Sequence, residues 1–181
     1  GEKISLVYPI LKDGVWDERE LESVVVDEKF IFEGELNATT NAYLLFENMD
    51  EVDLFIEPRR MIISLERGRP YDYSMRGLSV WPQQKECREF LGDMPRLIYE
   101  KSRDVQTLNE EWMKAYEMKS ESADSLMQEF YSVVRDYKTL AAKELDLRLE
   151  FIKSHPENAI SPYLLYGVAG AQHTDVSTIL S

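Results

Sequence analysis

The sequence predicts an α+β fold: an N-terminal antiparallel β-sandwich or barrel-like layer, followed by a long antiparallel helical hairpin and a shorter helix. Two observations carry this prediction. Up to residue 78, β-branched and aromatic runs alternate with polar turns at about the 8–12-residue spacing typical of antiparallel sheets. Beyond Pro82, apolar residues recur at helical i+3/i+4 intervals. We therefore divide the chain into a β part, residues 1–78, and a helical part, residues 79–181, and expect the two to pack as one structural unit.

The first β segments are marked by composition and by turn signals. Lys3–Ile10 is rich in β-branched residues, and the Asp13-Gly14 pair after it signals a turn. The stretch VVVDEKFIFEGEL, Val24–Leu36, places three valines before a charged turn and two alternating phenylalanines after it. This pattern predicts two strands joined by a turn, with Phe30 and Phe32 on one face toward the core. Further strands are expected at residues 41–47, 52–57, 60–66 and within 71–77.

A first long helical segment is expected from Pro82 to about Lys119. Proline suits a first helical position because its missing N–H costs nothing there. Gly92 and Pro95 should interrupt this helix, since proline removes a backbone hydrogen bond and clashes with the preceding turn. A capping box formed by Thr107 and Glu110 is an alternative position for the break.

The second long helix should begin after Ser122, a plausible N-cap, and end near Ser154. Ser161-Pro162 then begins a shorter helix. The two long helices should pack against each other as an antiparallel hairpin, although the same apolar stripe could serve a homodimer. The stripe on the second helix, which is broken at Arg148, consists of Leu126, Phe130, Val133, Tyr137, Leu140, Ala141, Leu145, Phe151 and Ile152.

The overall charge is strongly negative. Lys and Arg number 21 and Asp and Glu number 34, which gives a formal net charge of −13. A surface of this sign repels nucleic acid and anionic lipid, so we expect no nucleic-acid partner. The local basic cluster is interpreted as a solvated strand edge rather than an anion site. It consists of Arg59, Arg60, Arg67 and Arg69.

The residue types in the sequence do not indicate a catalytic site. Cys87 is the only cysteine, which excludes an internal disulfide and a C-x-x-C pair, and we interpret it as a structural thiol. His155, beside a proline at a helix end, is interpreted as a helix cap, and His173 as part of a solvated loop. Because no nucleophile, base and orienting acid can be assembled, we predict no catalytic residue, metal or cofactor, and no enzyme.

Two segments remain as candidate sites. The acidic stretch ENMDEVD, residues 47–53, offers oxygen ligands for Ca²⁺ but lacks the glycine and distal glutamate of an EF-hand loop, so we interpret it as a hairpin loop. Tyr71, Tyr73, Trp81 and Phe90 gather at the junction of the β and helical parts. Their simplest role is packing between layers, and their alternative role is a ligand groove.

Several motifs in order resemble a known family. The segment with Lys29, Phe30, Phe32 and Gly34 matches a strand-turn-strand signature, Lys-Phe-x-Phe-x-Gly. LFIEPRRMIISL resembles a Glu-Pro turn between strands, MRGLSV a glycine-containing step into the helices, and FIKSHPENAISPYLLY a helix end and restart. The chain thus resembles the N-terminal domain of unknown function that precedes the thioredoxin-like domain in envelope thiol-disulfide oxidoreductases of Gram-negative bacteria. It departs from that pattern at Glu28 and Arg59, where the family usually has glycine.

The resemblance implies a non-catalytic module of the cell envelope, periplasmic or on an outer-membrane lipoprotein, that acts in protein interaction, spacing or substrate presentation. Its partner would be another protein or a covalently linked thioredoxin-like domain after Ser181. A removed signal or lipid anchor before Gly1 would supply a membrane tether. The redox activity of the longer members does not carry over, because this chain has no C-x-x-C. The alternative is an envelope protein that binds a small molecule or peptide in the aromatic groove.

Overall fold

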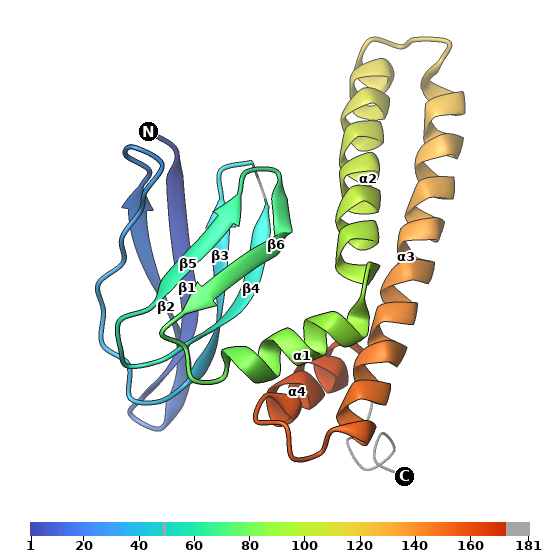
Figure 1. Ribbon diagram of the computed structural model, residues 1–181. Coiled ribbons are helices and arrows are strands. Elements are labelled where there is room, and N and C mark those ends of the chain that lie inside the picture. The colour runs from blue at the N-terminus through green and yellow to red at the C-terminus, as the bar shows by residue number, and fades with distance from the viewer. Residues whose placement is uncertain (49, 173–181) are drawn as a thin grey trace. The chain divides into compact units, whose positions relative to one another are not determined.

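A computed structural model of the chain describes residues 1–48 and 50–172 (Figure 1). In that part of the chain, six strands are followed by four helices. The predicted α+β class, with an antiparallel β layer before a helical hairpin, is confirmed. The chain divides into two compact units, Gly1–Gln84 and Lys85–Ser181, which we call the β unit and the helical unit. The expected packing of the whole chain as one structural unit stays a prediction.

The β unit contains two antiparallel sheets. The larger sheet has the strand order β2-β1-β3-β4, and the smaller one pairs β5 with β6. Alternate residues of β1, β3 and β4 point to one side of the larger sheet, where they are buried, as a half-buried strand requires. The strands are β1 (Lys3–Lys12), β2 (Val15–Val24), β3 (Thr40–Phe46), β4 (Glu51–Ile56), β5 (Ile62–Glu66) and β6 (Arg69–Arg76). The core side chains include Ile4, Leu6, Tyr8, Ala42, Leu44, Val52 and Leu54.

The predicted hairpin within Val24–Leu36 is wrong in its strands and right in its turn. The chain leaves β2 at Val24 and forms one isolated antiparallel bridge, Val26 to Lys29, around Asp27 and Glu28. Both turn residues have positive φ, 50° and 59°, as a type I′ turn requires. A strand also needs a neighbour to pair with, and the exposed edge of β2 carries carboxylates that discourage pairing. Valine-rich composition alone therefore did not produce a hairpin.

Phe30 and Phe32 follow that turn in irregular chain. Their ring centroids lie 5.7 Å apart in an edge-on arrangement, and both side chains are half-buried. The expectation that they lie on one strand face toward the core is therefore only partly met. Each phenylalanine shields the other from water instead of filling the space between two layers.

Sequence reasoning missed β2 and ended β1 too early. The segment VWDERELESV of β2 alternates no apolar residues over most of its length, yet it pairs with β1 along all ten of its residues. Pro9 lies within β1, and β3 pairs with β1 only from Ile4 to Val7. The missing N–H of Pro9 therefore removes no bond to β3. β1 continues to Lys12, and the outer halves of β1 and β2 form a two-stranded ribbon.

The helices follow the sequence signals closely. The first break lies at Gly92, φ +58°, with Pro95 in the first turn of the next helix. The alternative break at Thr107 is wrong, because the helix continues past it. Ser122 is the N-cap residue as predicted, although its side chain makes no capping bond. The helices are α1 (Trp81–Leu91), α2 (Met94–Glu117), α3 (Ala123–Ser154) and α4 (Ser161–Gln172).

The helical unit has a small core at one end and a thin hairpin at the other. Ile152 and Val168 are buried between α3 and α4, with Leu145, Leu149 and Leu164 packed around them. α2 and α3 pack antiparallel along their length, as predicted (Figure 1). The buried residues of α2 and α3 in the described chain are Met94, Ala115, Phe151 and Ile152. None of the helices described combines the length and apolar composition needed to cross a bilayer.

Candidate functional site

Two of the four aromatic candidates are in ring contact. Tyr73 on β6 and Trp81 at the start of α1 have ring centroids 5.8 Å apart. The Tyr73 hydroxyl donates to the Asp53 carbonyl oxygen at 2.5 Å and accepts from Gln84 Nε2 at 2.8 Å. The pair therefore belongs to a polar and aromatic cluster that ties the smaller sheet and the start of α1 to β4 within the β unit.

Tyr71 and Phe90 make other contacts. The guanidinium of Arg69 lies 5.9 Å from the centre of the Tyr71 ring, within cation–π range. Phe90 belongs to the helical unit, where its ring lies 5.5 Å from Phe151 and 5.9 Å from His155. A ligand groove lined by all four aromatic residues stays a prediction.

Gln84 adds an unusual feature to the Tyr73–Trp81 cluster. Its side chain is buried, and its Oε1 atom has no hydrogen-bond partner within residues 1–48 and 50–172. Buried amide oxygens are normally satisfied, because an unmade bond costs roughly 1–3 kcal/mol. The Oε1 atom is therefore an unsatisfied acceptor on a side chain whose Nε2 bonds to Tyr73.

Glu57 in the β unit is a buried carboxylate with several polar partners, and sequence reasoning did not single it out. Its buried carboxylate accepts hydrogen bonds from the Ser79 backbone N–H at 3.0 Å and from the Ser79 hydroxyl. Arg59 Nε lies 2.9 Å from Glu57 Oε2. The carboxylate thus anchors the chain just before α1, where exposed N–H groups favour a negative charge.

The charge state of Glu57 follows from these contacts. Burial raises the pKa of the Glu57 carboxyl, but hydrogen bonds from Ser79 and the positive charge of Arg59 outweigh burial, so this pKa lies below its ordinary value. The group is therefore ionised at neutral pH. The Glu57 carboxylate has a structural role, because it accepts hydrogen bonds from the protein's own donors.

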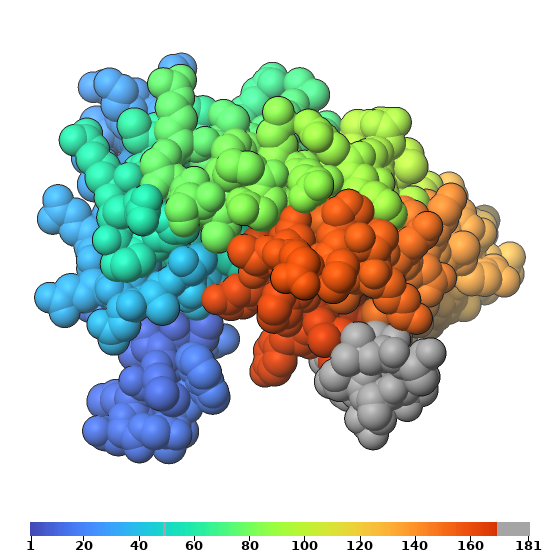
Figure 2. Space-filling view, turned by 60° about the horizontal axis from the view of Figure 1, so that its bottom comes forward, coloured from blue at the N-terminus to red at the C-terminus, as the bar shows by residue number. Residues whose placement is uncertain are grey.

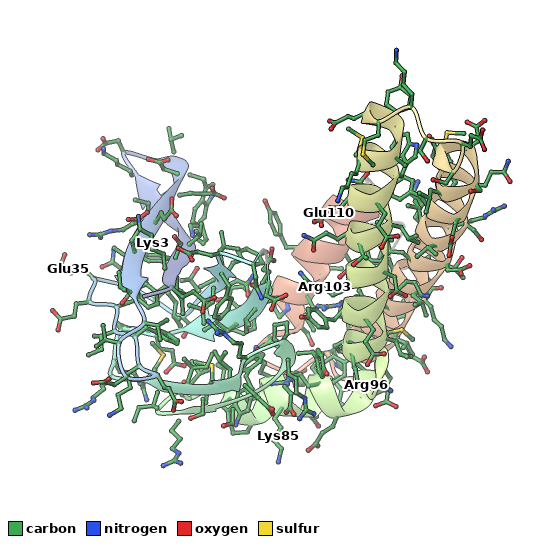
Figure 3. All side chains as sticks on the ribbon, turned by 90° about the horizontal axis from the view of Figure 1, so that it is seen from above. Lys3, Glu35, Lys85, Arg96, Arg103 and Glu110 are labelled. Carbon is green, nitrogen blue, oxygen red and sulfur yellow. The ribbon has the colours of Figure 1, made fainter. Side chains whose placement is uncertain are left out.

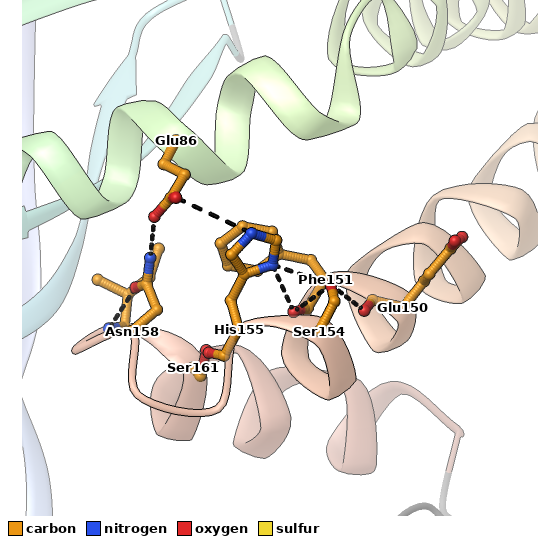
Figure 4. A network of polar contacts seen from close by, with 8 residues as sticks. Glu86, Glu150, Phe151, Ser154, His155, Asn158 and Ser161 are labelled. Atoms are coloured by element: carbon orange, nitrogen blue, oxygen red, sulfur yellow. Dashed lines mark hydrogen bonds and ion pairs between the residues drawn. The ribbon is translucent and has the colours of Figure 1, made fainter.

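His155 occupies the C-cap of α3, the place predicted for it (Figure 4). Its Nδ1 atom lies 3.1 Å from the Phe151 carbonyl oxygen and 2.9 Å from the Ser154 hydroxyl. On its other side, Glu86 of α1 lies 3.9 Å from His155 Nε2 and accepts a 2.8 Å hydrogen bond from Asn158. The network joins α1 to the end of α3. The Ser154 hydroxyl beside the imidazole also lies 2.8 Å from the Glu150 carbonyl oxygen of its own helix, which is the geometry of a helix-end cap.

Among the described residues, the other catalytic and metal candidates do not come together as a site. Cys87 is buried, which fits a structural thiol. His173 lies outside the described residues. Asp50 in the segment 47–53 exchanges hydrogen bonds with Asn48 in the β3–β4 turn, as a hairpin loop does. The described parts of the chain contain no group of three or more His, Cys, Asp or Glu side chains that could hold a metal ion.

The basic cluster is largely neutralised by the chain itself. Arg59 pairs with Glu57, Arg67 with Glu2, and Arg69 with both Glu66 and Asp72. An anion would have to displace these carboxylates. The pairing therefore favours the interpretation as a solvated strand edge over an anion site.

The outer β1–β2 ribbon carries the most exposed aromatic side chain of the β unit's strands. Its turn, Asp13-Gly14, has positive φ at both residues, which is the type I′ geometry that matches strand twist. Leu11 pairs directly with Trp16 across the ribbon, and these side chains are 62% and 73% exposed. Val15 at the turn is also exposed. Figure 2 shows the blue end of this ribbon protruding from the β unit.

Acidic residues surround these apolar side chains. Residues 9–20 contain four acidic residues and two basic ones. The acidic residues are Asp13, Asp17, Glu18 and Glu20, and each is exposed. We refer to Pro9–Glu20 as the arm. Sequence reasoning missed the arm because it did not expect β2, and the Asp13-Gly14 turn was the one signal that could have revealed it.

Comparisons with known proteins give no relative to guide interpretation. No family model, no curated protein and no solved structure matches this chain. Function must therefore be argued from the chain's own surfaces.

Proposed function

We propose that this chain is a non-catalytic protein-interaction module of the cell envelope, and that the arm is its docking element. The observation that carries the proposal is the exposed Leu11–Trp16 pair at the end of a ribbon that projects from the sheet. Neighbouring exposed apolar side chains on a projecting ribbon form a patch, and apolar patches with polar rims mark interaction sites. The envelope setting rests on the family resemblance alone.

The arm has the chemistry of a binding hot spot. Tryptophan supplies a large apolar area with few rotatable bonds, so its burial loses little conformational entropy. The type I′ turn and the ten-residue pairing of β1 with β2 hold Trp16 in place before any partner arrives. We infer that the partner offers an apolar pocket for Trp16, bordered by Lys and Arg that match the acidic residues of the arm. A thioredoxin-like domain or one of its protein substrates would fit the implied role in spacing or presentation.

Site-specific photo-crosslinking in the native host tests this role. A photoreactive phenylalanine analogue replaces Trp16 in the full-length gene product, and the same analogue at Ile62, which is exposed on β5, is the control. We expect a discrete protein adduct from position 16 only, and a weaker one at high salt because charge pairs border the pocket. Identical adduct patterns from positions 16 and 62, or no protein adduct from position 16, would overturn the proposal.

The alternative function, binding of a small molecule or peptide, has one observation in its favour. The unsatisfied Gln84 Oε1 lies in the same cluster as the Tyr73–Trp81 ring pair. A ligand donor bonded to this oxygen would be held against two aromatic faces. In a thermal-shift screen of envelope metabolites and peptides, a true ligand raises Tm for the unmodified protein and loses that effect in Trp81→Leu. A screen without any such compound counts against this alternative.

A further inference from the structure

Helix α3 carries an apolar inner stripe that contacts α2, and beside it an outer stripe that is apolar except for one lysine. The inner stripe consists of Leu126, Phe130, Val133, Tyr137 and Leu140. The outer stripe repeats the same spacing one residue later, as Met127, Tyr131, Val134, Lys138 and Ala141. Because each residue advances about 100° around a helix, the two stripes lie roughly 100° apart. Two adjacent heptad stripes are typical of a helix with two long helical neighbours.

The inner stripe has its neighbour in α2. Trp112 of α2 stacks on Phe130 at 5.7 Å with an interplanar angle of 17°. The continuation of the outer stripe also has a neighbour, because Leu145 and Leu149 pack around the buried pair Ile152 and Val168 between α3 and α4. Figure 1 shows α2 beside the N-terminal half of α3, and α4 near the C-terminal end of α3.

Two side chains in the N-terminal part of the outer stripe are exposed to solvent. Tyr131 is 56% exposed, Lys138 is exposed, and Met127, Val134 and Ala141 are half-buried. Tyr131 and Lys138 of the outer stripe thus face solvent, whereas Ile152 on the same side at the other end of the helix is buried in the core cluster with Val168 of α4. Tyr131 and Met127 are of residue types that are enriched in interface cores.

The charges around the outer stripe fit a second copy of the same surface. Asp124 lies seven residues before Tyr131 and Lys138 lies seven residues after it, two helical turns on either side of one face. If two α3 helices pack antiparallel with Tyr131 at the two-fold axis, Asp124 of each copy lies opposite Lys138 of the other. Parallel packing would instead bring like charges together. In the described chain, neither Asp124 nor Lys138 forms an ion pair.

Other charged side chains of the hairpin pair within their own segment, as Arg148 does with Glu144 on α3. On α2, Arg96 pairs with Asp93 and Glu100, and Lys101 pairs with Asp104; Figure 3 labels Arg96 and Arg103 along this helix. Residues 94–154 as a whole contain ten basic and twelve acidic residues, so the hairpin is nearly neutral. Residues 1–80 contain nine basic and 17 acidic residues. Self-association through the hairpin therefore avoids the repulsion that the acidic β unit would impose.

We propose that the outer stripe of α3 is a homodimer interface, in which α3 packs antiparallel against α3 of a second copy about a two-fold axis near Tyr131. The interface is isologous, because each copy contributes the same surface. The stripe spans about 21 Å along the helix, which is short for a permanent dimer, so we expect a dissociation constant on the order of micromolar. This proposal does not depend on the arm, which lies in the other unit.

Sedimentation equilibrium of the full chain is the first test. We expect the mass to rise from 21.2 kDa toward twice that value as the concentration passes about tenfold above micromolar. Tyr131→Glu places a charge at the axis and should keep the protein at 21.2 kDa. Ser132→Glu is the matched control, an exposed neighbour outside the stripe, and should dimerise as the unmodified protein does. Circular dichroism checks that each variant keeps its helices.

Charge reversal and crosslinking test the orientation. Lys138→Glu and Asp124→Lys should each weaken dimerisation about tenfold, and the double variant should restore it. Tyr131→Cys should form a disulfide-linked dimer, whereas Met127→Cys should not, because antiparallel packing separates the two copies of position 127. Cys87 is buried and does not compete. A monomer at every concentration, a dimer that tolerates Tyr131→Glu, or efficient crosslinking at position 127 would each overturn the proposal.

Discussion

The four-stranded sheet and the α2–α3 hairpin bury their apolar side chains to very different extents. In the sheet, Ile4, Leu44 and Val52 are almost completely enclosed, because the second sheet and the start of α1 complete the β unit. In the hairpin, the inner stripe is only half-buried, since each helix has a single long neighbour. Two helices cannot surround a core on their own. The comparison teaches that the sheet is complete within the chain, while the hairpin still has apolar surface to offer.

The largest effect should come from the sheet core. Leu44→Ala removes a side chain that is 2% exposed, and we expect a loss of about 2–5 kcal/mol in the free energy of unfolding, measured by urea denaturation. Leu45 follows on the exposed face of the same strand, so Leu45→Ala should cost less than about 1 kcal/mol. Equal losses for the two variants would mean that β3 does not have the assigned inner face.

A smaller loss in the free energy of unfolding should follow when a side chain is added at Gly77. This glycine has φ +83°, and a Cβ atom there would lie 2.5 Å from the Arg60 carbonyl oxygen. Gly77→Ala should therefore cost roughly 1–3 kcal/mol in unfolding free energy. Gly68, φ +74°, has open space around it, so Gly68→Ala isolates the conformational cost alone. If Gly68→Ala proved as damaging as Gly77→Ala, the close approach would have no role.

The ion-paired Glu57 carboxylate gives the stability of the β unit a dependence on pH. Because the pKa of Glu57 is lower in the folded state than in the unfolded chain, its stabilisation is present above the unfolded pKa and is lost as the pH falls through the folded pKa. Glu57→Gln should cost about 1–3 kcal/mol at neutral pH. The difference in unfolding free energy from the unmodified protein should shrink on acidification. A difference that stayed constant down to low pH would contradict this, and Glu47→Gln, exposed in a turn, is the control.

The smallest effect should come from the hairpin seam. Leu140 belongs to the inner stripe and is half-buried, so Leu140→Ala should cost only about 1 kcal/mol, well below the loss for Leu44→Ala. The same urea measurement compares them directly. A loss for Leu140→Ala as large as that for Leu44→Ala would show that the seam is as well enclosed as the sheet core, and the contrast between the two regions would fail.

The local signals in the sequence were sufficient for the helical half. Gly92 and Pro95 mark the break between α1 and α2, and α3 ends at Ser154 as expected. Glycine and proline restrict or free the backbone through their own covalent structure, so their effects do not depend on distant residues. The αα-hairpin follows from the periodicity between such breaks.

The candidate site was predicted less completely, because its contacts join residues that are far apart in the sequence. Tyr73 and Trp81 do lie in contact, but the role of Glu57 depends on Ser79, which is 22 residues away. The arm depends on β2, whose charged sequence has no strand pattern and which is held by pairing with β1. Such contacts join residues that are distant in sequence, and the sequence around one residue does not indicate its partner.

The sequence by itself determined the fold class, the order of strands before helices, the helix boundaries and the acidic charge, because propensity, periodicity and charge are properties of short segments. Only the tertiary structure decided that Val24–Leu36 contains a turn without a hairpin, that Trp16 stands exposed on the arm, and that the outer stripe of α3 is left open. Strand pairing and burial depend on which distant segments meet, and a chain read residue by residue does not contain that information.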